Sequence, residues 1–263
     1  MIKKEILISS LGNTIEWFDF GLFIFMAPIL GAKFFPQASA SNATIEALIV
    51  FAAGFLCRPL GGIFFGYFGD TRGRAKTLRI SILIITISTV LVGFIPSYEK
   101  IGLTAPVLFI LLRLIQGISI GSEYSGIIIY LAESAPRNKR GFTTSFAAIG
   151  ANLGFLLATA TLMLLHLFFS EKVIADWVWR LPFLLIGLPG SLIIYYRFKL
   201  SETPVYSQLK KNHRLEPIPF IAAIKFAPYQ LLKILGLTCM GSTFYYVFFG
   251  YMPTYLGQVL KVL

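Results

Sequence analysis

The sequence predicts an all-α polytopic membrane protein, and three features of its composition and pattern support this fold class. Hydrophobic residues make up 56% of the 263 residues and charged residues only 13%, and the mean hydropathy is +0.77. Soluble domains contain roughly 45–50% apolar and about 25% charged residues. The apolar residues gather in uninterrupted runs of about 20 residues or more, which is the length a helix needs to cross a bilayer.

Seven such runs predict seven membrane spans, and the first of them raises the question of a signal peptide. A basic flank precedes this run, but no small-residue cleavage site follows it, and it carries Glu16 and Asp19. It is therefore interpreted as a retained membrane helix. The predicted spans cover residues 12–35, 44–68, 78–96, 105–131, 142–168, 178–197 and 229–256.

The basic residues predict the orientation of these spans. If the N-terminus is cytoplasmic, 15 Lys and Arg residues fall on cytoplasmic segments and four at most on outside segments. Cytoplasmic loops are enriched in Lys and Arg, so the sequence predicts this orientation. The net charge of +11 is explained by these short loops, and nucleic acid is not expected as a partner.

A short basic turn between the second and third runs organises the chain. Residues 66–76 read Gly-Tyr-Phe-Gly-Asp-Thr-Arg-Gly-Arg-Ala-Lys, with glycines that permit a tight turn. Three positive charges within seven residues predict that this turn is cytoplasmic. The plain alternative is an ordinary loop that only sets topology.

The first span carries two carboxylates three residues apart, Glu16 and Asp19, which share one helical face. Ionisable groups inside a membrane are costly and mark functional sites, and a carboxyl group can bind and release a proton. The alternative is that both groups lie in interfacial water near the cytoplasmic helix end.

The fourth span places polar groups in an otherwise apolar helix: Arg113, Gln116, Glu123 and Tyr124. A buried arginine must be paired or hydrated. The candidate partners of Arg113 are Glu16, Asp19, Asp70 and Glu123, and structural pairing alone is the alternative to a functional role. Glycines at positions 117 and 121 predict a surface on which another helix packs closely.

Opposite charges also gather at the predicted cytoplasmic face, where Glu133 and Arg140 follow the fourth span. Together with Asp70, Arg72 and Arg74 they form a candidate cytoplasmic gate, whose ion pairs hold helix ends together in one state and part in another. The alternative is helix capping and topology alone.

Several other classes of site are not expected. The two cysteines, Cys57 and Cys239, lie in apolar runs with no metal-ligand spacing, so neither a disulfide framework nor a metal is predicted. No nucleophile elbow or phosphate loop is present, so no cofactor and no enzymatic activity are predicted. Aromatic residues crowd the seventh span and favour either an interfacial belt or a cation–π cradle for a quaternary ammonium. They are Phe244, Tyr245, Tyr246, Phe248, Phe249, Tyr251 and Tyr255.

Taken together, these stretches resemble the major facilitator superfamily, and within it the metabolite:proton symporter family. The spacing G-x-x-x-D-x-x-G-R-x-K of the basic turn carries the superfamily resemblance. The family resemblance rests on segments in family order, which begin at Gly12, Arg58, Gly66, Gln116, Glu133, Trp179 and Glu202. Within the family, proline/glycine betaine transporters are most similar, through residues 19–21, 95–98 and 245–255.

The resemblance implies a six-helix N-terminal half at residues 1–197, a cytoplasmic central loop at 198–228, and the first helix of a second half at 229–263. It implies alternating access around a midplane site. Proton and substrate coupling are expected of six residues: Glu16, Asp19, Arg113, Gln116, Glu123 and Tyr124. The cytoplasmic gate is expected to comprise Asp70, Arg72, Arg74, Glu133 and Arg140.

The function expected from the resemblance is proton-coupled symport of a small osmolyte such as proline or glycine betaine. One alternative is a carrier of organic acids of the 2-oxoglutarate or citrate type. Another is a truncated or split-gene product that is inactive alone or needs a separately encoded C-terminal half. The expected partners are the small molecule, protons and membrane lipid, and the expected location is the bacterial inner membrane.

Overall fold

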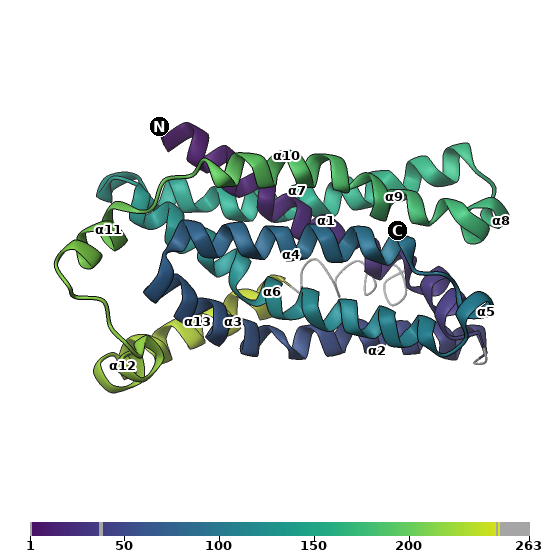
Figure 1. Cartoon of the computed structure of the whole chain (residues 1–263), viewed down its shortest axis with the longest axis horizontal. Helices are drawn as coiled ribbons and strands as arrows, with labels where there is room; N and C mark the ends of the chain where they lie inside the picture. Colours follow the sequence, from purple (N-terminus) through teal and green to yellow (C-terminus); the bar gives the residue numbers. More distant parts are fainter. Residues whose placement is uncertain (1, 37–38, 246, 248–263) are drawn as a thin grey trace. The chain divides into compact units, whose positions relative to one another are not determined.

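The computed structural model describes residues 2–36, 39–245 and 247, and all regular structure in these residues is helical. The chain divides into two compact units, Met1–Leu215 and Glu216–Leu263, which are described separately. The first unit is a bundle of long helices that run side by side (Figure 1).

Six helical spans in the described residues are long and apolar enough to cross a membrane. The bundle is built from these helices: α1 (Ile2–Phe34), α2 (Ala40–Leu56), α3 (Arg58–Arg72), α4 (Arg74–Phe94), α6 (Thr104–Ser134), α7 (Arg140–Phe168), α9 (Arg180–Leu185) and α10 (Gly187–Phe198). Short helices connect or follow them: α5 (Tyr98–Ile101), α8 (Glu171–Val173) and α11 (Pro204–Lys211). The first six predicted spans are therefore confirmed.

Two spans differ in detail from the sequence prediction. The first helix begins at Ile2 rather than near residue 12, because Ile8 packs into an apolar cluster and extends the helix beyond the predicted hydrocarbon run. The second span is broken at Cys57 into α2 and α3. Pro59 lies at the start of α3, and proline removes a backbone donor that a continuous helix would need.

The second unit contains α12 (Pro219–Phe226) and α13 (Pro228–Tyr245), which are bent by 97° at the break between them. If the bent pair is one span, it is the seventh candidate in the described residues. The predicted seventh span ran to residue 256, and Tyr246 and residues 248–256 lie outside the described residues. The predicted domain limits at residues 197 and 228 stay predictions.

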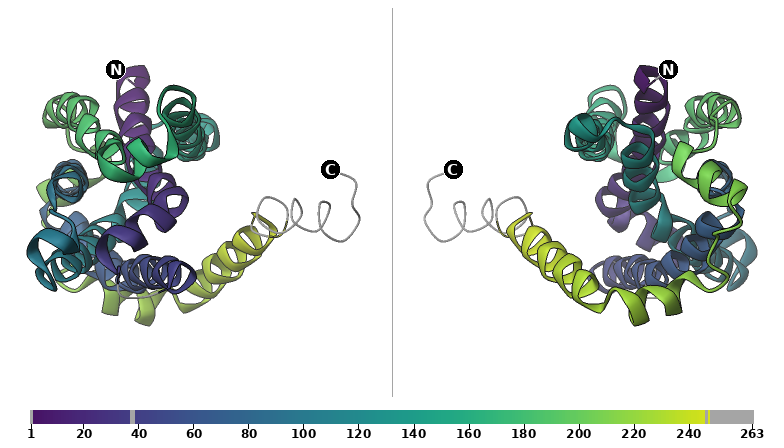
Figure 2. Two further views of the ribbon diagram at one scale, coloured as in Figure 1. Left: turned by 90° about the vertical axis from the view of Figure 1, so that its right-hand side faces the viewer. Right: turned by 90° about the vertical axis from the view of Figure 1, so that its left-hand side faces the viewer.

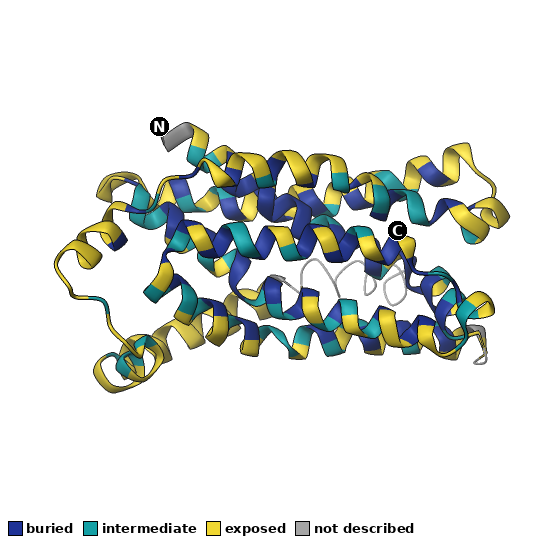
Figure 3. Cartoon of the chain, viewed as in Figure 1, coloured by how far each residue is buried: buried dark blue, intermediate teal, exposed yellow. Residues whose placement is uncertain are grey.

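Within the bundle, α1 packs along α7 and also along α2 (Figure 2). The buried residues of the long helices face the bundle interior, and their outward faces are exposed and apolar (Figure 3). An outward apolar surface is what a lipid-facing bundle needs, because the hydrocarbon core offers no polar partners.

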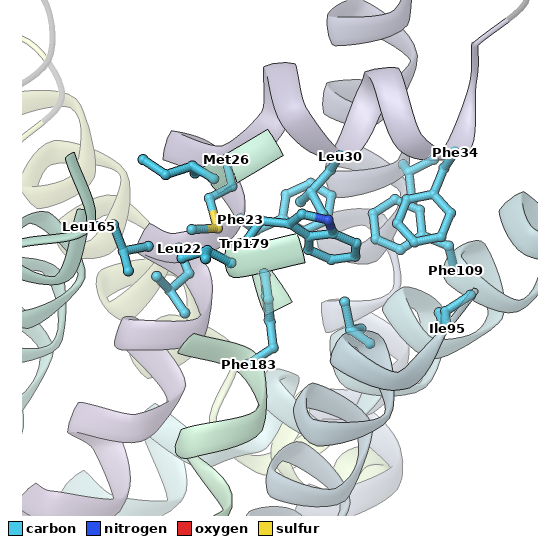
Figure 4. Close-up of a cluster of buried hydrophobic side chains, with 14 of the residues drawn as sticks. Leu22, Phe23, Met26, Leu30, Phe34, Ile95, Phe109, Leu165, Trp179 and Phe183 are labelled. Carbon is cyan, nitrogen blue, oxygen red and sulfur yellow. The ribbon is translucent and has the colours of Figure 1, made fainter. Parts of the chain in front are cut away.

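An aromatic cluster fills one part of the interior, around the fully buried Trp179 (Figure 4). Phe34 stacks on Phe109 with ring centroids 4.3 Å apart and meets Trp179 edge-on at 6.0 Å. Trp179 follows a π-helical turn at Ile174–Val178 that leads into α9. Trp179, near the start of the sixth predicted span, is thus part of the buried core.

Glycines allow the closest helix contacts, as the sequence predicts for α6. A Cβ atom on Gly117 would lie 2.8 Å from the carbonyl carbon and 2.9 Å from the Cα atom of Gly54 in α2. A Cβ on Gly150 of α7 would lie 3.2 Å from the carbonyl carbon of Ser10 in α1. Since these neighbours are backbone atoms, only a shift of a whole helix could make room.

We predict that Gly117→Ala destabilises the bundle, because overpacking a tight interface costs about 1–3 kcal/mol. Thermal unfolding of the purified protein in detergent, followed by circular dichroism, measures the effect. Gly66→Ala is the matched control, since no atom lies within 4 Å of a Cβ placed there. Equal melting temperatures for the two variants would contradict the close contact of α2 with α6.

Candidate functional site

A buried ion pair between α1 and α6 lies at the centre of the candidate site. Arg113 Nη1 donates to Asp19 Oδ2 at 2.8 Å, and Asp19 and Arg113 are 0% and 4% exposed. The Arg113 guanidinium also lies 3.9 Å from the centroid of the Phe23 ring. Of the four partners considered for Arg113, the structure pairs it with Asp19.

Two neutral side chains complete this first charge centre. Thr89 Oγ1 of α4 donates to Asp19 Oδ1 at 2.9 Å. Gln116 Nε2 donates to Thr89 Oγ1 at 2.9 Å and to Asp19 Oδ1 at 3.4 Å. Side chains of two helices, α4 and α6, therefore donate to one carboxylate of α1, and the structure brings Asp19, Arg113 and Gln116 together.

A second charge centre surrounds Glu123, which lies about two turns after Gln116 on α6. Its carboxylate is fully buried, pairs with the Arg197 guanidinium of α10 and accepts a hydrogen bond from the Ser81 hydroxyl of α4. Arg197 Nη1 also donates to the carbonyl of Leu78 at 2.6 Å. Gly12 lies against this guanidinium, and a Cβ there would come within 2.8 Å of Arg197 Nε.

Glu16 lies between these two centres. Its side chain is 1% exposed, and it is close enough to four charged groups to interact with them electrostatically, namely Arg58, Glu123, Arg197 and Asp19. Its Oε2 atom has no hydrogen-bond partner among the described residues. The alternative that Glu16 and Asp19 lie in interfacial water is wrong in this structure, because both are shut away from solvent.

Tyr124 is only half-buried and makes an edge-on contact with Trp17, with ring centroids 6.2 Å apart. Among the described residues it forms no hydrogen bond to either charge centre, but its phenol is close enough to Glu16 to interact with that carboxyl group electrostatically.

Three residues of the site were not predicted from the sequence. Arg197 lies at the last residue of the sixth predicted span, beside the basic central connector, and the structure buries it completely near the end of α10. Thr89 and Ser81 are small polar residues in an apolar run, and neither carries a charge that marks it. Gly12 leaves space for the Arg197 guanidinium, but this contact could be recognised only from the packing of the helices.

Three of the residues predicted for the cytoplasmic gate lie together at the turn between α3 and α4. Arg74 pairs with Asp70 at 2.5 Å and with Glu133 of α6 at 3.5 Å. The Arg74 and Glu133 side chains are 19% and 18% exposed, so this network is partly buried. Arg72 and Arg140 are exposed, and within the described ranges neither forms a salt bridge.

The segment after α10 is held to this turn by hydrogen bonds. Glu202 Oε1 accepts hydrogen bonds from the backbone N–H of Ala75 at 2.9 Å and of Thr203 at 3.2 Å. Thr203 Oγ1 donates to Glu133 at 2.6 Å. Gly73, with φ of 118°, supplies the backbone conformation that starts α4.

Tyr206 of α11 adds a further bond, from its hydroxyl to the carbonyl of Thr71 at 3.0 Å. Burial, and then the nearby Glu202 carboxylate, raise the pKa of the Tyr206 phenol above its ordinary value. The hydroxyl therefore stays protonated and remains a donor. The beginning of the predicted central connector is thus held against the candidate gate.

Among the residues that the structure describes, no group of three or more His, Cys, Asp or Glu side chains could hold a metal ion. The charged groups that the structure pairs in the site are carboxylates and guanidinium groups. Such pairs can exchange partners when a carboxylate takes up a proton, because its charge is then lost.

Comparison with known proteins identifies the family. Residues 6–223 match the family described as "Sugar (and other) transporter". The chain belongs to this family. Its members are transporters rather than enzymes, and the chain is a multi-pass protein of the plasma membrane with an all-α fold.

Relatives in this transporter family include two that carry specific names. The glycine betaine/proline/ectoine/pipecolic acid transporter OusA of Dickeya dadantii is 43% identical over 98% of this chain and 54% of that protein. The proline/betaine transporter of Escherichia coli is 42% identical, with the same coverage. The chain thus spans about half the length of these curated relatives.

Solved structures support the fold. The xylose transporter XylE from E. coli, in an inward open conformation, matches with a TM-score of 0.71 and 22% identity, over 92% of this chain and 56% of that one. The fold is that of the N-terminal half of a major facilitator transporter, as the sequence predicts.

We predict that Asp19→Asn strongly destabilises the protein, because removing one partner of a buried ion pair costs about 3–5 kcal/mol. The double variant Asp19→Asn/Arg113→Gln should recover part of this loss, since it leaves no buried charge. Thermal unfolding in detergent measures both. Asp176→Asn, at an exposed position, is the control. If the double variant loses as much stability as the two single variants lose together, or more, the pairing is wrong.

We also predict that Glu202→Ala loosens the start of α4, because a carboxylate at a helix N-terminus contributes about 0.3–1 kcal/mol beyond its hydrogen bonds. Hydrogen exchange of a peptide that contains Ala75 should become several-fold faster. Glu202→Gln should have a smaller effect, because it keeps an acceptor. The exposed Glu216 offers a control variant, Glu216→Ala. Unchanged exchange in Glu202→Ala would argue against the cap.

Proposed function

We propose that the protein acts in proton-coupled symport of small osmolytes such as proline or glycine betaine, by alternating access. The observation that carries the proposal is the buried Asp19–Arg113 ion pair, which lies inside the membrane-spanning bundle. Ionisable groups at such a depth are retained for substrate or ion pathways. The names of the similar transporters from Dickeya dadantii and E. coli support the choice of substrates.

The coupling step follows from the chemistry of this pair. Deprotonated Asp19 neutralises Arg113 and accepts hydrogen bonds from Thr89 and Gln116. When a proton binds to Asp19, the carboxylate loses its charge and Arg113 is left without a counter-ion. A substrate carboxylate can then pair with the guanidinium, so proton and substrate enter together.

The second charge centre extends the proton route. Glu123 is held by Arg197 and Ser81, and Glu16 lies between Glu123 and Asp19. We propose that these three carboxylates pass the proton between the substrate level and the end of the bundle that carries the Asp70 turn. Gln116 keeps Asp19 oriented, and Tyr124 borders the path through its contact with Trp17.

We propose that the cluster of Asp70, Arg74 and Glu133 is the cytoplasmic gate, with the N-terminus also cytoplasmic. Partial burial makes these pairs stronger than surface ion pairs, which contribute about 0–1 kcal/mol. The exposed Arg72 and Arg140 are available to pair with other segments when the gate rearranges. Rocking around the midplane site would break and remake these contacts.

Uptake measurements test the proposal. The protein is expressed in cells that lack their own carriers for these solutes, and labelled proline, glycine betaine and 2-oxoglutarate are offered under an imposed proton gradient. We expect gradient-dependent uptake of the two osmolytes and not of 2-oxoglutarate. Uptake of 2-oxoglutarate instead would replace the substrate class, and absence of all uptake with protein in the membrane would refute symport by this chain.

We predict that Glu123→Gln reduces gradient-driven uptake at least about 10-fold, as expected when a positioned proton carrier is removed. Exchange of labelled for unlabelled substrate at equal pH should be retained better, because it needs no net proton transfer. Glu99→Gln at an exposed position is the control and should match the unmodified protein in both assays. Equal losses in uptake and exchange would contradict a coupling role for Glu123.

A further inference from the structure

A cleft beside the Asp19–Arg113 pair has an aromatic wall that neither the coupling step nor the gate uses. It lies between α1, α2, α3 and α6, and three phenylalanines, three polar side chains, two glycines and one isoleucine line it. The lining side chains important here are Phe20, Phe51, Phe55, Arg58, Arg113 and Gln116. In this structure its cavity volume is about 20 Å³, which is room for about one water molecule.

The three phenylalanines form one aromatic wall. The ring centroids of Phe20 and Phe51 are 4.6 Å apart, those of Phe20 and Phe55 are 4.9 Å apart, and those of Phe51 and Phe55 are 5.1 Å apart. Each ring therefore contacts both of the others. Such a wall presents the negative faces and positive edges that bind cations and apolar groups.

A cation already lies on this wall. The guanidinium carbon of Arg58 is 4.0 Å from the centroid of Phe55 and 5.0 Å from that of Phe20. Both distances lie within the range of about 6 Å at which a cation is attracted to a ring face. The aromatic wall is thus able to hold a positive charge, and movement of Arg58 would free space for another.

The opposite side of the cleft offers groups for a carboxylate. Arg113 uses Nη1 to bind Asp19, while its Nε and Nη2 atoms have no hydrogen-bond partner among the described residues. The Oε1 atom of Gln116 also lacks a partner in the described ranges, and as an acceptor it suits an N–H donor of the ligand rather than its carboxylate. Buried donors and acceptors without partners are costly, so a ligand that satisfies them gains binding free energy.

The position of the cleft fits a transport substrate. Phe20 lies close to the middle of the span Lys4–Phe34, and Gln116 lies close to the middle of Thr104–Ser134. Phe55 lies near the middle of Ser41–Arg72. All three elements therefore reach the cleft at mid-membrane depth, where substrate sites of transporters are formed.

We infer that this cleft is a subsite for a zwitterion, with its cationic nitrogen on the Phe20, Phe51 and Phe55 rings and its carboxylate on Arg113. The inference rests on the proposed function and adds the residues that recognise the substrate. The nitrogen takes the place that the Arg58 guanidinium occupies over the rings. A quaternary ammonium has no N–H donor, so it depends on the rings, whereas the N–H groups of proline can also donate to Gln116.

The test compares ring variants of Phe55 in the uptake assay. Phe55→Leu removes the aromatic face and should raise the KM for glycine betaine about 5- to 30-fold, the range expected for a desolvated cation–π contact. The KM for proline should rise less. Phe55→Tyr keeps a ring and should stay close to the unmodified protein. Phe64→Leu is the control, since Phe64 is an exposed ring of α3 outside the cleft.

Several outcomes would overturn the inference while leaving symport intact. They are uptake of both osmolytes with an unchanged KM in Phe55→Leu, an equal rise for both substrates, or an equal rise in Phe55→Leu and Phe55→Tyr. If no osmolyte is taken up at all, the proposed function fails separately. Calorimetric titration of the purified protein with glycine betaine then decides the inference: ring-dependent binding supports it, and no binding overturns it.

Discussion

Two buried carboxylates, Asp19 and Glu123, each pair with an arginine on another helix, and the arrangement of the helices depends on these two pairs. Asp19 brings α1 to α6 and α4, and Glu123 brings α6 to α10 and α4. In a medium without water, an unpaired ion would cost more than the packing around it contributes. The charge centres therefore fix which helices are neighbours and at what depth.

The tight helix contacts serve the same requirement. Gly117 brings the backbones of α2 and α6 together, and Gly12 leaves room for the Arg197 guanidinium. Short side-chain bonds across the bundle are possible only where the helices approach this closely. Packing by small residues and pairing of charges are thus two aspects of one geometry.

Much of this could be predicted from the sequence, because hydrophobic run length and loop charge are local properties. The six spans, the turn at residues 66–76 and the members Asp19, Arg113 and Gln116 follow from such local signals. The partner of Arg113 could not be chosen among four carboxylates, since that choice depends on helix rotation. The aromatic wall could not be predicted from the sequence, because its rings are distributed over α1 and α2. The aromatic residues that are close together in the sequence lie instead in the predicted seventh span, much of which is outside the described residues.

The long sequence separation of the ion pairs has a consequence for how the protein is made. Asp19 and Arg113 are 94 residues apart, so α1 leaves the ribosome well before its counter-ion exists. At a synthesis rate of about 5–20 residues per second, the wait lasts roughly 5–20 seconds. During that interval the first helix carries carboxyl groups with no intramolecular partner. Until α6 supplies Arg113, α1 bears the cost of its buried Asp19, about 2.5–3.5 kcal/mol on insertion scales. The charge pairs therefore bear on biogenesis as well as on the finished fold.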